Sequence, residues 1–281
     1  MGSDPTEDVV RQAREYYDSD DADRFYFNIW GGEDIHIGLY EEGGESIFDA
    51  SHKAVERMAD LVAPGIGPDS RVLDIGAGYG GSARALAKRF GCSVVCLNLS
   101  EVQNQRNRRM NEEQGLAGKI EVHDGNFEDL PFGENEFDVV WCQESLLHSG
   151  RRETIFREVD RVLKPGGTFV FSDPMQKEPA DRERLQPVYD RIHLPSLGSV
   201  EAYDGYAEKL GWKREGFEDR SPHLPVHYQA VHDELQRRRD RVEGEIISTD
   251  YIERMLAGLR HWVSAGREGL LQWGTLLYRK P

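Results

Sequence analysis

The sequence predicts an α/β fold: a doubly wound, mostly parallel sheet of seven strands, with an N-terminal lid and helical insertions. From residue 71 onward, short apolar runs alternate with helical patterns, which is typical of parallel strands buried beneath crossover helices. A glycine-rich turn over 76–81 follows the first apolar run, where such a fold brings backbone close to a ligand. The length of 281 residues suits one large domain with insertions.

Two segments precede the sheet. Residues 1–45 are acidic and rich in aromatic side chains, and we expect them to form the lid or a packed N-terminal extension. A helix over 46–62 is predicted because apolar side chains recur at helical spacing: Ile47, Ala50, Ala54, Met58 and Leu61. The prolines and glycines of 64–68 end this helix.

Strands and helices then alternate regularly. The predicted strands are short apolar runs at 71–75, 93–100, 119–125, 137–143 and 168–173. The helices between them are predicted to end at Phe90, to cover 101–113 and to cover 154–163, the last closed by the Lys-Pro-Gly-Gly sequence of 164–167. Right-handed crossovers would place these helices on both faces of the sheet.

The chain is less regular after Asp173. Prolines and charges of both signs at 174–200 indicate one insertion, and long polar helical stretches at 222–268 indicate a second. A helix over 200–210 and a strand over 212–218 are predicted between them, and 270–280 is the predicted last strand. Residues 46–281 are therefore expected to form one domain with two insertions that contribute to a substrate site.

Charge excludes some classes of partner. The chain carries 35 Lys and Arg against 51 Asp and Glu, a net charge of −16 at pH 7. Such a field repels phosphate backbones and anionic lipids, so we expect no nucleic acid and no membrane as partners. Only eight of the basic residues are lysines. Abundant carboxylate with scarce lysine indicates adaptation to high salt, where screening weakens self-repulsion, although an ordinary acidic cytosolic protein is the alternative.

The sequence also predicts a cytoplasmic location. It contains no apolar run long enough to span a membrane and no charged-then-apolar leader. Cys92 and Cys96 would lie about 13 Å apart along one strand, too far for a disulfide. With Cys142 in another apolar run, we expect reduced core thiols, and no metal-ligand spacing is present.

The glycine turn has polar companions at the ends of later strands. Glycine there can serve close ligand approach, but a strand-to-helix turn can also require it for geometry alone. Asn98 follows Gly78 by twenty residues, where dinucleotide folds place an acidic side chain on ribose, and an amide can both donate and accept there. The third strand ends in the polar and aromatic run of 123–127, which could flank a purine.

Four motifs in order resemble the class I S-adenosylmethionine-dependent methyltransferases, whose fold is Rossmann-like. They are VLDIGAGYGG at 72–81, CLNLS at 96–100, DGNFEDLPFGENEFDVVW at 124–141 and REVDRVLKPGGTFVFSD at 157–173. Further strings at 16–40, 97–107, 145–149 and 270–280 extend the resemblance over nearly the whole chain to the sarcosine/dimethylglycine N-methyltransferases. A weaker similarity exists to phosphoethanolamine methyltransferases.

The resemblance implies S-adenosylmethionine as cofactor and S-adenosylhomocysteine as product. Carried over to this sequence, the glycine turn would hold the methionine part, Asn98 and Leu99 the ribose, and Asn126 and Phe127 the adenine. Asn98 departs from the acidic residue usual in the superfamily, which weakens the ribose assignment. The full set of cofactor positions implied is Tyr17, Gly76, Ala77, Gly78, Asn98, Leu99, Gln103, Asn126, Phe127, Gln143 and His148.

The substrate, a small methylated amino acid, would need a cation for its carboxylate and ring faces for its amine. Arg191 suits the carboxylate because a guanidinium binds it bidentately, although it could be a surface arginine. Ring faces attract a methylated ammonium, yet each candidate aromatic could equally be lid packing. The substrate positions expected are Tyr26, Trp30, Met175, Arg191, His193 and Tyr206.

Glu144 and His148 are the candidate catalytic pair. Helical spacing of four would put them on one face, so that His148 takes the ammonium proton and Glu144 orients it. The alternative is that His148 only lines the cofactor pocket and has no part in proton transfer. Most of the other histidines are expected at the surface: His36, His52, His223, His227, His232 and His261.

Three functions remain open from the sequence. The first is methylation of sarcosine and dimethylglycine to give the osmolyte betaine, which agrees with the salt-adapted composition. The second is the same chemistry on another small amine, such as glycine or phosphoethanolamine; balanced charges over 174–193 mildly favour a carboxylate over a phosphate. The third is a cofactor-binding regulator without catalysis. The protein is expected to be a monomer or a homodimer.

Overall fold

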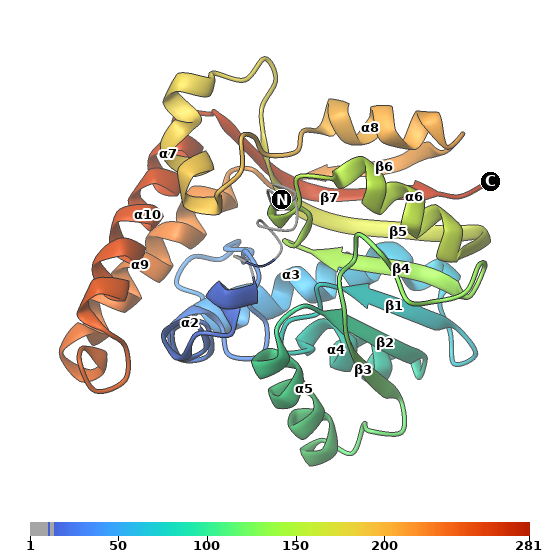
Figure 1. Cartoon of the computed structure of the whole chain (residues 1–281), viewed down its shortest axis with the longest axis horizontal. Helices are drawn as coiled ribbons and strands as arrows, with labels where there is room; N and C mark the ends of the chain where they lie inside the picture. Colours follow the sequence, from blue (N-terminus) through green and yellow to red (C-terminus); the bar gives the residue numbers. More distant parts are fainter. Residues whose placement is uncertain (1–10, 12–13) are drawn as a thin grey trace, which may run out of the picture.

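A computed structural model describes residue 11 and residues 14–281, and it confirms the predicted α/β fold (Figure 1). A seven-stranded sheet has the order β3-β2-β1-β4-β5-β7-β6. Its strands are β1 Arg71–Ile75, β2 Ser93–Asn98, β3 Ile120–Asp124, β4 Phe137–Gln143, β5 Leu163–Gln176, β6 Lys213–Asp219 and β7 Leu271–Arg279. All neighbouring pairs are parallel except those of β7, which is antiparallel to both β5 and β6.

Helices cover both faces of this sheet. The helices are α3 Ile47–Val62, α4 Gly81–Phe90, α5 Glu101–Glu113, α6 Arg152–Val162 and α8 Val200–Lys209. Successive residues of one strand point to opposite faces, so Leu73 packs into the core beneath α6 and α8, whereas Val72 packs into the core beneath α3 and α4. Both strand faces are buried, which explains why these strands are apolar without alternation.

The structure extends β5 beyond its predicted ends. Residues 164–167, predicted to close a helix, and residues 174–176, predicted to begin an insertion, both belong to the strand. At 174–176 the physical reason is the antiparallel pairing with β7, whose register runs from Thr168 opposite Arg279 to Gln176 opposite Leu271. At the start of the strand, Leu163 pairs with Phe137 of β4, and the Gly166 amide donates to the Lys280 carbonyl at 3.0 Å. Pairing between distant segments thus overrode the local turn signal.

A second core lies beside the sheet. Helix α7 Arg182–Ile192 and the hairpin of α9 His223–Val242 and α10 Thr249–Arg267 pack there against the N-terminal segment (Figure 1). That segment contains α2 Asp20–Phe25 and the short π-helix η1 Tyr26–Trp30. Phe25 and Trp30 are buried in this second core. Residues 1–10 and 12–13 of the predicted lid lie outside the described residues.

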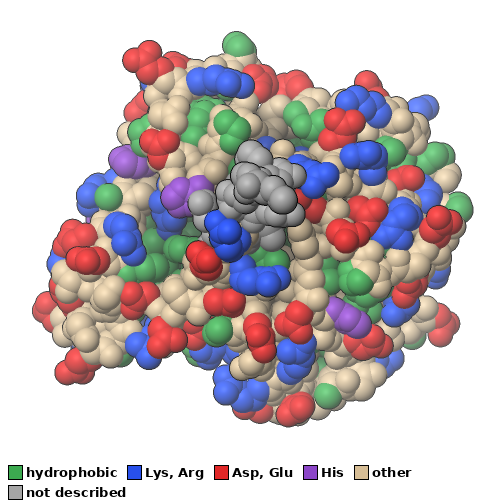
Figure 2. Space-filling view, viewed as in Figure 1, with side chains coloured by type: hydrophobic (Ala, Val, Ile, Leu, Met, Phe, Trp, Pro, Cys, Tyr) green, Lys and Arg blue, Asp and Glu red, His purple; other side chains and the backbone are tan. Residues whose placement is uncertain are grey.

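Charges of both signs are intermingled on the face seen in Figure 2. Among the described residues, no helix is both long enough and apolar enough to cross a membrane. Cys92, Cys96 and Cys142 are all buried and unpaired, as predicted.

Candidate active site

A cavity of about 210 Å³ opens at the carboxyl ends of the parallel strands, where ligands bind in open α/β sheets. Its walls come from three parts of the chain: the sheet and the loops that follow its strands, the N-terminal segment, and the second core formed by α7, α9 and α10. Every cofactor position that the resemblance implied lines this cavity, from Tyr17 to His148. These residues therefore lie together at one cavity, and their role in holding the cofactor stays a prediction.

Glycine at position 76 gives that wall its shape. Gly76 has a φ of 76°, in the left-handed region that side chains avoid. A Cβ there would lie 2.2 Å from Oγ of Ser145, so no larger residue fits. The amide of Gly76 donates to the carbonyl of Leu97 at 2.8 Å, which ties the end of β1 to β2. The result is a groove with backbone at its floor.

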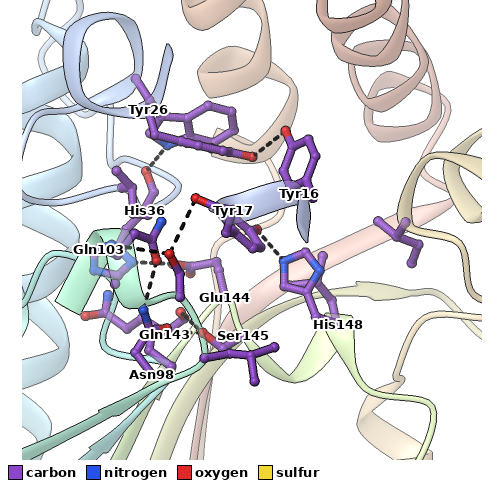
Figure 3. A pocket seen from close by; sticks show the side chains of 18 of the residues that line it. Tyr16, Tyr17, Tyr26, His36, Asn98, Gln103, Gln143, Glu144, Ser145 and His148 are labelled. Atoms are coloured by element: carbon purple, nitrogen blue, oxygen red, sulfur yellow. Dashed lines mark hydrogen bonds and ion pairs between the residues drawn. The ribbon is translucent and has the colours of Figure 1, made fainter. Parts of the chain in front are cut away.

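Polar groups at the end of β2 suit the sugar part of a nucleoside. The side-chain amide of Asn98 donates to Oε1 of Gln103 at 2.9 Å (Figure 3). The Ser100 hydroxyl caps α5 by accepting a hydrogen bond from the backbone amide of Gln103 at 3.2 Å. The buried Nε2 of Gln103 has no hydrogen-bond partner among the described residues, and such an orphaned donor is costly unless a ligand pairs with it. The glycine groove and this amide fit S-adenosylmethionine.

Arg191 supplies the positive charge of the cavity. Its guanidinium donates to the Tyr16 hydroxyl at 3.0 Å and contacts Sδ of Met255 at 2.8 Å. Gly258 on α10 makes room for it, because a Cβ there would lie 2.9 Å from Nε of Arg191. All these neighbours are neutral, so among the described residues no carboxylate pairs with Arg191. The guanidinium is thus available to an anionic ligand.

Aromatic rings form the wall beside Arg191. Tyr26 and Trp30, both predicted to bind substrate, line the cavity with ring centroids 5.4 Å apart. Trp30 also packs edge-on against Tyr228 of α9 at 5.8 Å. Tyr228 in turn stacks on Trp262 of α10 at 5.0 Å. Ring faces of this kind attract a methylated ammonium group.

Two of the predicted substrate positions are wrong. Tyr206 does not line the cavity; it lies on α8 and packs 5.6 Å from Phe156 on the outer side of the sheet. Met175 is fully buried in the core beneath α6 and α8, because its side chain alternates with that of Pro174, which does line the cavity. His193 lies at the cavity, exposed, after the end of α7.

Glu144 and His148 both line the cavity, but the predicted contact between them is wrong. The chain does not continue as a helix: Glu144 has a φ of 47°, and residues Leu146–His148 form a single 3₁₀ turn. The Glu144 carboxylate instead accepts from Nδ1 of His36 at 2.9 Å. It also accepts from Ser172 at 2.5 Å and from Trp273 at 3.0 Å. Glu144 therefore orients His36 rather than His148.

His148 contacts the N-terminal segment. Its Nε2 and the hydroxyl of Tyr17 lie 2.8 Å apart (Figure 3). Burial, together with the positive charges of Arg191 and Arg152, lowers the pKa of His148 to about 4. The imidazole is therefore neutral at neutral pH. Burial also raises the pKa of the Tyr17 hydroxyl, so the contact joins two uncharged groups.

Several residues of the site escaped the sequence analysis. His36, expected at the surface, is buried; burial alone would oppose its protonation, but the hydrogen bond to Glu144 and nearby carboxylates raise its pKa above the usual value. His227, also expected at the surface, is fully buried beside Trp30. Tyr228, Trp262 and Met255 belong to apolar helix faces, and periodicity cannot separate a core ring from one that lines a cavity.

Comparison with known proteins agrees with the fold and with a methyltransferase activity. Residues 73–171 match a family model described as a methyltransferase domain. Sarcosine/dimethylglycine N-methyltransferase of Aphanothece halophytica is 51% identical over 97% of this chain and 98% of that relative.

Solved structures are similar too. One from Galdieria sulphuraria, described as a sarcosine dimethylglycine methyltransferase, is 41% identical with a TM-score of 0.89, covering 94% of this chain and 98% of that one. A Haemonchus contortus phosphoethanolamine N-methyltransferase in complex with S-adenosyl-L-methionine shares the fold at 19% identity and a TM-score of 0.80, covering 95% of this chain and 60% of that one. The chain belongs to the sarcosine/dimethylglycine N-methyltransferase family of class I, S-adenosylmethionine-dependent methyltransferases.

Proposed function

We propose that this protein methylates sarcosine to dimethylglycine and dimethylglycine to glycine betaine. The observation that carries the proposal is Arg191, the only Lys or Arg among the described residues that line the cavity. One guanidinium with neutral neighbours matches the single carboxylate of these amino acids. Glu33, Glu128 and Glu144 line the same cavity, and their charge disfavours a phosphate dianion such as phosphoethanolamine carries.

The chain's own residues divide the cavity between the two ligands. Gly76, Asn98 and Gln103 would hold the cofactor, which supplies an electrophilic methyl group when it is bound. Arg191 would hold the substrate carboxylate, and the aromatic wall would face the amine. Fixing both ends of a small zwitterion orients its nitrogen, and orientation lowers much of the barrier to a displacement.

The amine must lose a proton before it attacks. His148 is a poor acceptor for that proton near neutral pH, because burial and the charges of two arginines lower its pKa to about 4. Its role is instead to bind Tyr17 and so to hold the N-terminal segment over the cavity. Arg191 favours the deprotonated, anionic form of the amino acid, so the substrate would react as the free amine.

The N-terminal segment is proposed to serve as a lid that excludes water. Tyr17 contacts His148, Asp18 accepts from Ser100 at 2.7 Å, and Asp23 forms an ion pair with Arg106. These contacts reach both the acceptor side of the cavity and the helix that follows β2. A closed segment would protect a reactive sulfonium from hydrolysis.

The physiological setting is proposed from composition. A net charge of −16 with few lysines supports work at high salt, and betaine is an osmolyte, so osmoprotection is the proposed role. The three buried, unpaired cysteines support a reducing compartment such as the cytoplasm. Activity that rises with salt concentration would support this setting.

The test is a product profile by mass spectrometry with glycine, sarcosine, dimethylglycine and phosphoethanolamine offered separately. We expect dimethylglycine from sarcosine and betaine from dimethylglycine. Arg191→Lys should raise KM for both amino acids about tenfold or more, because an ammonium cannot form the bidentate contact. Arg182→Lys, on the exposed start of the same helix, is the control and should leave KM unchanged.

Methylation of phosphoethanolamine alone would overturn the proposed substrates. Binding of S-adenosylhomocysteine with no transfer to any amine would favour a regulator instead.

A further inference from the structure

Tyr228 belongs to the aromatic wall of the cavity, but none of the assignments above uses its hydroxyl. It lies on α9, is 7% exposed and lines the cavity. Its ring is held on two sides, by stacking on Trp262 at 5.0 Å and by the edge-on contact with Trp30 at 5.8 Å. A ring fixed in this way presents its hydroxyl in one direction.

The hydroxyl of Tyr228 has no hydrogen-bond partner in the part of the chain that the structure describes. Although the residue is mostly buried, its oxygen is not among the described polar atoms that are both buried and unpaired, so it is accessible from the cavity. The other tyrosines beside Arg191 are paired: Tyr16 bonds to Tyr251 at 2.9 Å and lies 3.3 Å from the hydroxyl of Tyr26. Tyr228 therefore keeps free capacity that a ligand can use.

The ring contacts place Tyr228 on the acceptor side of the cavity, because Trp30 and Trp262 belong to the aromatic wall that is proposed to face the amine. Burial raises the pKa of Tyr228, the charge of Glu144 and the hydroxyl of Tyr17 raise it further, and Arg191 opposes them. The phenol stays protonated and neutral, with oxygen lone pairs that can accept a hydrogen bond.

We propose that the Tyr228 hydroxyl accepts the N–H of sarcosine and so sets the enzyme's preference between its two substrates. The inference rests on the proposed function. When the amine is unprotonated, as the reaction requires, sarcosine has one N–H and dimethylglycine has none. A hydroxyl acceptor can therefore distinguish the first methylation from the second.

The hydrogen bond would strengthen during the first transfer. The nitrogen lone pair of sarcosine forms the new N–C bond, the methyl–sulfur bond breaks and its electron pair stays on sulfur. The N–H stays on a nitrogen that becomes positively charged, and a hydrogen bond to a charged donor is stronger than one to a neutral donor. An interaction that is stronger in the transition state accelerates the reaction. In the second transfer, no N–H is present to benefit.

The test compares Tyr228→Phe with the wild-type enzyme on sarcosine and on dimethylglycine. We expect kcat/KM for sarcosine to fall on the order of tenfold or more, and kcat/KM for dimethylglycine to stay within about threefold. Tyr206→Phe removes the same phenol oxygen outside the cavity and should leave both values unchanged. Calorimetric binding of S-adenosylhomocysteine to each variant shows that the cofactor half is intact.

Equal losses for both amino acids would overturn the inference, because they would indicate that the hydroxyl binds the shared carboxylate. Unchanged values for both would overturn it as well. A wild-type enzyme that methylates neither amino acid would instead reject the proposed function, so the two failures are distinguishable. If Tyr228→Phe does not fold, Trp262→Phe replaces the ring on which Tyr228 stacks and so loosens the position of its hydroxyl. This variant should also lower the ratio of kcat/KM for sarcosine to kcat/KM for dimethylglycine. An unchanged ratio would count against the inference.

Discussion

The hydroxyl of Tyr17 lies 2.8 Å from Nε2 of His148, although 131 positions separate the two residues in the chain. The contact joins the N-terminal segment to the turn that follows β4. Both groups are partly buried and uncharged at neutral pH, so the main effect of the contact is to position the N-terminal segment. It closes the cavity on the side where the methyl acceptor is proposed to lie.

Removing the hydroxyl should open that side. We expect Tyr17→Phe to lower kcat/KM for sarcosine by about tenfold, because one buried hydrogen bond contributes about 1 kcal/mol and its loss leaves His148 unpaired. Steady-state rates measure the effect. The double variant with His148→Gln should fall little further than the worse single variant, since both changes remove one contact. Additive losses would contradict this.

The pH profile separates a positioning role of His148 from a role as proton acceptor. Because its pKa lies near 4, the ring stays neutral from about pH 6 to 9 and contributes no inflection there. We expect His148→Gln to lower turnover while the shape of kcat/KM against pH stays the same. Loss of an inflection in the variant would instead identify His148 as the base.

Glycine 76 should be required for cofactor binding. Gly76→Ala places a Cβ 2.2 Å from Oγ of Ser145, at a φ of 76°. Gly166→Ala is the matched control, because Gly166 has the same φ of 76° but nothing within 4 Å of an added Cβ. Both variants should lose about 1–2 kcal/mol of stability from backbone strain. Only Gly76→Ala should lose S-adenosylhomocysteine binding in calorimetry. Equal affinities of the two variants would contradict a role of the glycine groove in holding the cofactor.

Glycine 258 should matter for the substrate alone. Gly258→Ala would push against Nε of Arg191, 2.9 Å from the new Cβ, and we expect KM for sarcosine and dimethylglycine to rise about tenfold. Alanine favours a helix interior by about 1 kcal/mol over glycine, so thermal stability should not fall much. Gly205→Ala on α8, with nothing within 4 Å, is the control for that helix effect. An unchanged KM would mean that Arg191 does not bind the carboxylate.

The fold was predictable because its signals are local. Each parallel strand is a short apolar run, and α3, α5 and α8 begin at serine caps that the chain carries in sequence: Ser46, Ser100 and Ser199. The errors arose where distant segments pair. Strand β5 runs to Gln176 only because β7, nearly a hundred residues later, pairs with it from Thr168 to Gln176. The helix expected after Glu144 fails because that residue adopts a left-handed conformation beside Ser172 and His36.

The sequence alone determined the order of strands and helices along the chain, the glycine turn and the strand-end residues that are proposed to hold the cofactor, since ligands at a sheet edge are held by residues that directly follow each strand. The sequence named Arg191, Tyr26 and Trp30 as substrate candidates, but only the tertiary structure decided which residues meet in the acceptor half. Arg191, Tyr228, Gly258 and Tyr17 come from separate helices and an N-terminal segment whose periodicity shows a buried face but not what it faces. Their meeting depends on how α9 and α10 pack against the N-terminal segment, and no spacing within the chain encodes that packing.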